Sequence, residues 1–66
     1  MQIVVNGKTR DVPQGETVLG LLRSLEIEPD RVAVEVDRRI VKQPEWPATV
    51  LVPGVEVEIV HFVGGG

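Results

Sequence analysis

The 66-residue sequence predicts an α+β fold: a mixed four- to five-stranded sheet with one helix packed on one face. Three observations predict it. Asn6-Gly7 separates two short strand-like segments, the apolar spacing becomes helical after Thr17, and the late segment "VEVEIVHFV" alternates strictly. Because one helix covers only one face of such a sheet, the other face is expected to be bare.

The opening "MQIVVNGKTRDVP" reads as an antiparallel hairpin. Its residues alternate before Asn6-Gly7, which is the strongest short turn signal, and a second strand ends at Pro13. Thr17 then caps a helix whose apolar face repeats at i, i+3, i+4 and i+7. Gly20 weakens this helix by up to about 1 kcal/mol relative to Ala. Pro29 ends any continuation. The apolar face consists of Val18, Leu21, Leu22 and Leu25.

Three further strands and a loop complete the predicted sheet. "RVAVEVDRRIV" alternates and turns at Asp37-Arg38 into a short strand over residues 39–41. "KQPEWPATVLVPG" holds three prolines and is expected to be a loop with at most a helical turn, beneath which Trp46 fills the core. The long last strand fits best in the middle of the sheet, beside the first. That arrangement is the β-grasp, the ubiquitin-like roll.

Composition excludes several classes of function. The chain has no cysteine, which removes disulfides, zinc–thiolate sites and thiol nucleophiles. A net charge of −3, scattered basic residues and only Trp46 and Phe62 for stacking argue against a nucleic-acid partner. No signal peptide or membrane-spanning run is visible, so we expect no membrane partner and a cytoplasmic protein. The sequence shows no catalytic dyad and no metal-ligand cluster.

The last strand sorts its side chains by face. Val57 and Ile59 are expected to point to the core, whereas Val60 and Phe62 point outward together with Val4 of the first strand. These three are predicted to form an exposed apolar docking surface. The same strand carries Glu56 and Glu58 on one face, which favours solvated surface or contact with a basic partner, and His61, which is most simply a half-buried sheet residue.

The final "GGG" divides the chain into a β-grasp domain, residues 1–63, and a flexible glycine tail, residues 64–66. In a chain without cysteine, the α-carboxylate of Gly66 is the one sterically bare reactive group. Adenylation would give it a good leaving group, and a sulfur nucleophile could then displace AMP to leave a thiocarboxylate.

Taken together, "MQIVVNGK", "ETVLGLLRSL", "VAVEVDRRIVKQPEW" and "VHFVGGG" resemble the ThiS family, the bacterial sulfur carriers of thiamine biosynthesis. The resemblance implies that Gly66 is adenylated and then carries sulfur as a thiocarboxylate for thiazole formation. It also implies a protein co-substrate that is not itself an enzyme and binds no cofactor. It implies that Gly64 and Gly65 thread the channels of partner enzymes. Val4, Val60 and Phe62 would then dock those partners. The implied partners are a ThiF-like adenylyltransferase that uses ATP and magnesium, a ThiG-like thiazole synthase, and a cysteine desulfurase as the indirect sulfur source.

Three alternatives stay open on the sequence. A MoaD-like small subunit of molybdopterin synthase would share the fold and the tail, although such chains are usually longer. A ubiquitin-like protein modifier would use the same activated glycine to form an isopeptide bond with lysine. A plain interaction module would keep the fold with an inert tail.

Overall fold

A computed structural model describes residues 1–63 of the chain. The predicted tail, Gly64–Gly66, lies outside the described residues. The elements are β1 (Gln2–Val5), β2 (Lys8–Asp11), α1 (Val18–Ser24), η1 (Pro29–Arg31), β3 (Val32–Val36), β4 (Arg39–Val41), η2 (Gln43–Ala48) and β5 (Glu56–His61), where η marks a 3₁₀ helix.

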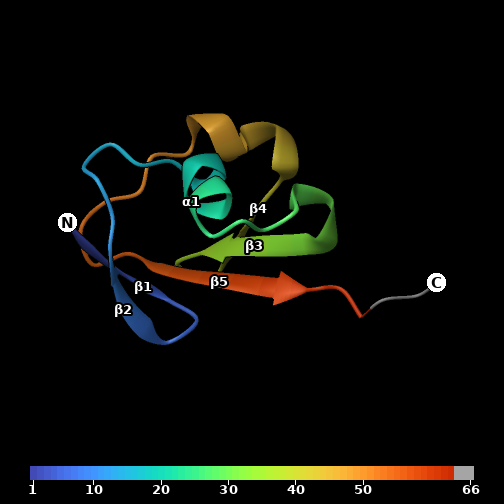
Figure 1. Ribbon diagram of the computed structural model, residues 1–66, viewed down its shortest axis with the longest axis horizontal. Coiled ribbons are helices and arrows are strands. Elements are labelled where there is room, and N and C mark those ends of the chain that lie inside the picture. The colour runs from blue at the N-terminus through green and yellow to red at the C-terminus, as the bar shows by residue number, and fades with distance from the viewer. Residues whose placement is uncertain (64–66) are drawn as a thin grey trace.

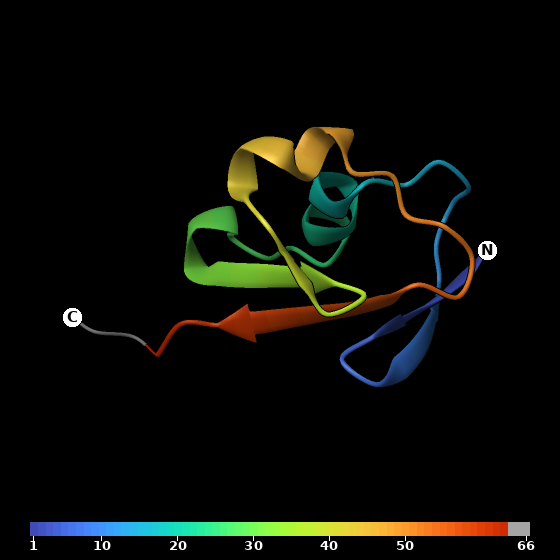
Figure 2. The ribbon, with the colours of Figure 1, turned by 180° about the vertical axis from the view of Figure 1, so that it is seen from behind.

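The five strands form one mixed sheet in the order β2-β1-β5-β3-β4. β1 and β5 run parallel in the centre, and the other neighbouring pairs are antiparallel. α1 and η2 lie together on one side of the sheet (Figure 1). The view from behind likewise shows no helix on the opposite side (Figure 2). The predicted β-grasp, with the last strand beside the first and one bare face, is confirmed.

Both predicted hairpin turns have the same backbone geometry. Asn6 and Gly7 take φ of 48° and 81°, and Asp37 and Arg38 take 48° and 68°. Positive φ at both central residues defines the type I′ turn, whose twist matches that of the flanking strands. Asn6 and Gly7 are residue types that tolerate positive φ, which explains the first turn. Arg38 adopts positive φ in the second turn although it has a side chain that disfavours this conformation.

The helix begins as predicted and ends earlier. Thr17 is the N-cap, and its Oγ1 accepts the Gly20 N–H at 3.0 Å. After Ser24 the chain closes a Schellman-type end, in which the Ile27 N–H donates to the Leu22 carbonyl. Glu26 takes the left-handed position of this motif with φ 58°. Since that position usually holds glycine, the sequence carries no visible stop signal before Pro29.

The core lies between the sheet and the α1–η2 layer. Trp46 is only 2% exposed, and its Nε1–H donates to the Val41 carbonyl at 2.8 Å, so its predicted place under the proline loop is confirmed. None of the described helices is long and apolar enough to span a membrane. Within residues 1–63 the buried side chains are all apolar: Ile3, Val5, Val12, Val18, Leu21, Leu22, Val32, Val34, Trp46, Leu51, Val55, Val57 and Ile59.

Candidate functional site

The last strand leads the chain out of the sheet at one end of the molecule. His61 pairs with Val32, the first residue of β3, and the Phe62 N–H donates to the Arg31 carbonyl at 2.9 Å. The predicted strand continued to Val63 but ends at His61, because β3 offers no partner before Val32. Val63, the last described residue, is 95% exposed.

Two of the three predicted docking residues lie together at this exit. Val60 pairs with Ala33 on the bare face, and Val60 and Phe62 are 49% and 59% exposed. Val4 is half-buried and lies opposite Glu56, four residues before Val60 along β5. At about 3.3 Å per residue this separates Val4 from Val60 by roughly 13 Å. The structure therefore does not bring Val4 to the other two.

A fourth apolar side chain on this face, which the sequence reasoning missed, shares a hollow with Phe62. Ile40 in β4 is 73% exposed and lies opposite Glu35 on the bare face. Ala33, Ile40 and Phe62 line one hollow of about 300 Å³ beside the exit of the chain. The signal was present in "RRIV", where alternation puts Ile40 on the face opposite to Val41. We call Ile40, Val60 and Phe62 the apolar patch.

Carboxylates lie beside the apolar patch on the same face. Glu35 and Glu58 are direct cross-strand partners in the antiparallel β3–β5 pair. Like charges in that position destabilise a sheet. Glu56, two residues before Glu58, is exposed. Its backbone N–H donates to Oδ1 of Asp37, in the turn between β3 and β4, at 3.1 Å. The bare face is therefore apolar near the chain exit and acidic toward the middle of β5.

The remaining candidate residues show no catalytic arrangement within residues 1–63. His61 is exposed rather than half-buried as expected, because β5 ends there. No group of three His, Asp or Glu side chains in the described part of the chain is placed to hold a metal ion. The predicted sulfur-carrying and threading residues, Gly64, Gly65 and Gly66, lie outside the described residues. What the described site offers is an exposed surface of apolar and acidic side chains.

A five-stranded mixed sheet with the last strand beside the first and the helices on one face defines a ubiquitin-like β-grasp protein. The sequence matches the model of the ThiS family over residues 3–66. The chain belongs to the ThiS family, which its motifs resemble.

Solved structures agree with this assignment. The crystal structure of the thiamine biosynthesis protein ThiS from Geobacter metallireducens superposes with a TM-score of 0.87 at 32% identity, over all of both chains. A solution NMR structure of a thiamine biosynthesis protein from the same organism gives a TM-score of 0.82 at 33% identity, covering all of this chain and 88% of that one.

Two curated relatives are much longer. Thiazole synthases from Magnetococcus marinus and Paramagnetospirillum magneticum are 39% and 36% identical over all 66 residues of this chain. The chain spans about a fifth of their length, 20% in each case. Each of these two thiazole synthases thus contains, within a longer polypeptide, a segment that is similar to this chain.

Proposed function

We propose that Gly66 is the sulfur-carrying residue of this protein and that the apolar patch docks the enzymes that load and unload it. The observation that supports the proposal best is the position of β5. As the central strand of a ThiS-family fold, it leads the chain out beside an exposed Phe62 at the edge of the bare face. A docked enzyme would thus hold the domain while the glycines enter its active site.

The chemistry takes place on the carboxylate of Gly66, which must be free. That carboxylate attacks the α-phosphorus of ATP and releases pyrophosphate, which leaves an acyl adenylate. A persulfide sulfur then attacks the acyl carbon and displaces AMP, which gives an acyl disulfide. A thiol reductant cleaves the S–S bond and leaves the thiocarboxylate. The carrier supplies only the acyl group, and the activating enzyme supplies magnesium and the positioning groups.

The proposed partners follow the same order. A ThiF-like adenylyltransferase activates Gly66, a cysteine desulfurase provides the persulfide sulfur, and a ThiG-like thiazole synthase receives the sulfur. The thiazole synthase is supported by the two relatives of that name, in which a segment similar to this chain belongs to the same polypeptide. The ThiS family match favours this route over the MoaD-like alternative.

Intact-mass spectrometry tests the carrier function directly. The protein is incubated with ATP, magnesium, a ThiF-like enzyme, a cysteine desulfurase, cysteine and a thiol reductant. We expect a gain equal to the mass difference between sulfur and oxygen, located on Gly66 by fragmentation. Deletion of Gly66 should abolish the gain without changing the circular dichroism spectrum. A gain that survives the deletion, or that maps to an Asp or Glu side chain, would refute the proposal.

Substitution in the apolar patch tests the docking surface separately. Phe62→Asp places a charge at a side chain that is 59% exposed, so the fold should be retained. Loss of an aromatic anchor commonly weakens an interface by about 2 kcal/mol or more, which is about 30-fold in the dissociation constant. Val52→Asp is the matched control, because Val52 is 56% exposed outside the sheet. Equal affinity of both variants for the adenylyltransferase would show that the patch is not the docking surface.

A further inference from the structure

A second surface hollow lies on the other side of the sheet, at its β2 end. It has a volume of about 370 Å³ and is lined by Val5, Asn6, Lys8, Thr9, Arg10 and Leu25. Two of these residues are cationic and none is acidic, although the whole chain carries a net charge of −3. The hollow therefore presents two positive charges on a protein that is acidic as a whole.

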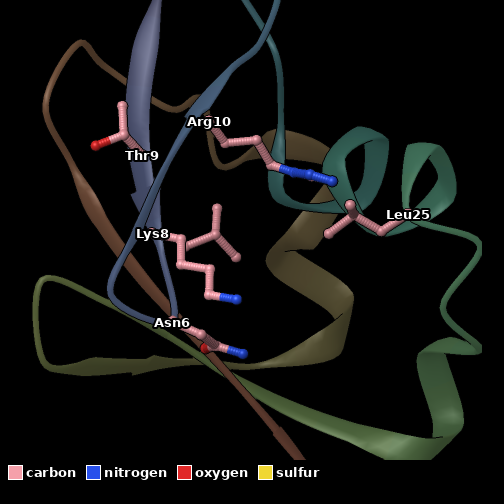
Figure 3. Close-up of a pocket in the computed structure, with 6 residues that line it drawn as sticks. Asn6, Lys8, Thr9, Arg10 and Leu25 are labelled. Atoms are coloured by element: carbon pink, nitrogen blue, oxygen red, sulfur yellow. The ribbon is translucent and has the colours of Figure 1, made fainter.

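The hairpin register explains why both cations reach this hollow. Lys8 pairs with Val5 and Arg10 pairs with Ile3, so all four side chains share the face that carries α1. Ile3 and Val5 are covered by the core, whereas every residue of β2 is exposed. In Figure 3 the side chains of Lys8 and Arg10 leave β2 on the same side, while Thr9 points the other way. Arg10 extends toward Leu25, and Lys8 extends toward Asn6 at the turn.

The apolar wall comes from the early end of the helix. α1 has only seven residues, and its C-cap Leu25 is half-buried against the core. Asn6 closes the hollow at the turn, but its side chain is already engaged, since Oδ1 accepts the Ile59 N–H at 2.7 Å and Nδ2 donates to the Ile59 carbonyl at 3.2 Å. The groups that remain for a ligand are thus an ammonium, a guanidinium and an apolar surface.

We propose that this hollow binds a small organic anion, with one phosphate or carboxylate group held between Lys8 and Arg10 and an apolar body against Leu25. A guanidinium binds such oxyanions in a bidentate manner and an ammonium adds a compact charge. The volume lies in the range of small-molecule sites. Because the hollow and the apolar patch lie on opposite faces of the sheet, the ligand and a docked enzyme can be bound at the same time.

Phenyl phosphate is a suitable probe, followed by the backbone amide chemical shifts of the full-length protein. We expect saturable shifts at residues 8–10 and at Leu25, with a dissociation constant of about 1 to 10 mM. Inorganic phosphate lacks the apolar body and benzyl alcohol lacks the charge, so each should bind more weakly. Sodium benzoate should shift the same amides, because the site recognises an anionic group on an apolar body.

Paired variants decide whether the hollow itself is responsible. Lys8→Gln with Arg10→Gln should weaken phenyl phosphate binding by at least about tenfold. Arg39→Gln with Lys42→Gln removes the same charge elsewhere and should leave the affinity unchanged within about twofold. If both double variants weaken phenyl phosphate binding equally, the binding is due to general charge attraction and the proposal is overturned. The absence of saturable shifts would also overturn it and would leave the two cations as protection of an exposed sheet edge.

Discussion

The Asn6 side chain ties the first hairpin to the last strand, and its removal should destabilise the whole sheet. β1 and β5 pair in parallel at Val4–Glu56 and Val5–Val57, and the Asn6 N–H then donates to the Val57 carbonyl at 2.9 Å. After Val57 the side-chain amide of Asn6 continues the pairing with β5. Its Oδ1 accepts the Ile59 N–H, and its Nδ2 donates to the Ile59 carbonyl. One side chain thus replaces the next step of the backbone ladder.

The expected magnitude follows from these two hydrogen bonds. Each contributes about 0.5 to 1.5 kcal/mol net, so Asn6→Gly should lower the free energy of unfolding by roughly 2 kcal/mol. Glycine is the right replacement because Asn6 has φ 48°, which glycine adopts without strain. For a domain of this size the loss corresponds to a fall in Tm of roughly 8 to 16 °C.

The second hairpin provides a matched control. Asp37 also has φ 48° at the first central position of a type I′ turn, and its Oδ1 accepts one exposed hydrogen bond of 3.1 Å. Asp37→Gly therefore has the same backbone entropy cost as Asn6→Gly, but it removes one side-chain hydrogen bond instead of two. We expect Asn6→Gly to be the more destabilising of the two by at least about 1 kcal/mol.

Urea unfolding followed by Trp46 fluorescence measures both variants, since the indole is buried and is the chain's only tryptophan. The midpoint should fall while the slope of free energy against urea stays the same, as expected when only stability changes. Equal destabilisation by the two glycine variants would show that the turn backbone dominates and that the Asn6 bridge to Ile59 adds nothing.

Three further substitutions test the helix cap, the core and the bare face. Thr17→Ala should cost about 1 kcal/mol by leaving the Gly20 N–H without its Oγ1 acceptor, and a loss no larger than that of the exposed Thr9→Ala would contradict the cap. Trp46→Phe should cost about 2 kcal/mol through lost ring volume and the lost bond to Val41. Because this variant has no tryptophan, its urea unfolding is followed by circular dichroism, and an unchanged midpoint would mean that the core adapts freely. Glu35→Thr should stabilise the protein by about 0.2 to 1 kcal/mol by removing the charge opposite Glu58. That gain should shrink in 1 M salt, and a salt-independent gain would point to strand propensity instead.

Local patterns predicted the elements because each depends on neighbouring residues. Asn6-Gly7 identified the first turn, Thr17 the helix start, and alternation put Val57 and Ile59 in the core, where they are 2% and 5% exposed. The early helix end was missed because Glu26 occupies a left-handed position with no glycine to announce it. A backbone conformation that a residue type strongly prefers can be predicted from the sequence. A conformation that a residue adopts against its preference, such as the positive φ of Glu26, cannot.

The candidate site was only partly predictable, since it depends on register between distant strands. Alternation predicts on which face of the sheet a strand residue lies, but it does not predict which residue of the neighbouring strand pairs with it. Val4 was therefore placed with Phe62, although the parallel register puts it opposite Glu56. The bond from Asn6 to Ile59 spans 53 positions and has no local signal. The cationic hollow likewise needs both the hairpin register and the short helix that leaves Lys8 and Arg10 uncovered.

The charge layout of the bare face connects stability with the proposed docking. Domains of this size are marginally stable, so an unfavourable Glu35–Glu58 pair is a real cost. A basic partner surface would relieve that repulsion on binding and would be steered toward the face as it approaches. We therefore expect Glu35→Thr, although more stable, to associate more slowly with the adenylyltransferase at low salt. The difference should vanish at high salt, where surface charges are screened. An unchanged association rate at low salt would confine the acidic face to a solvated surface and leave docking to the apolar patch alone.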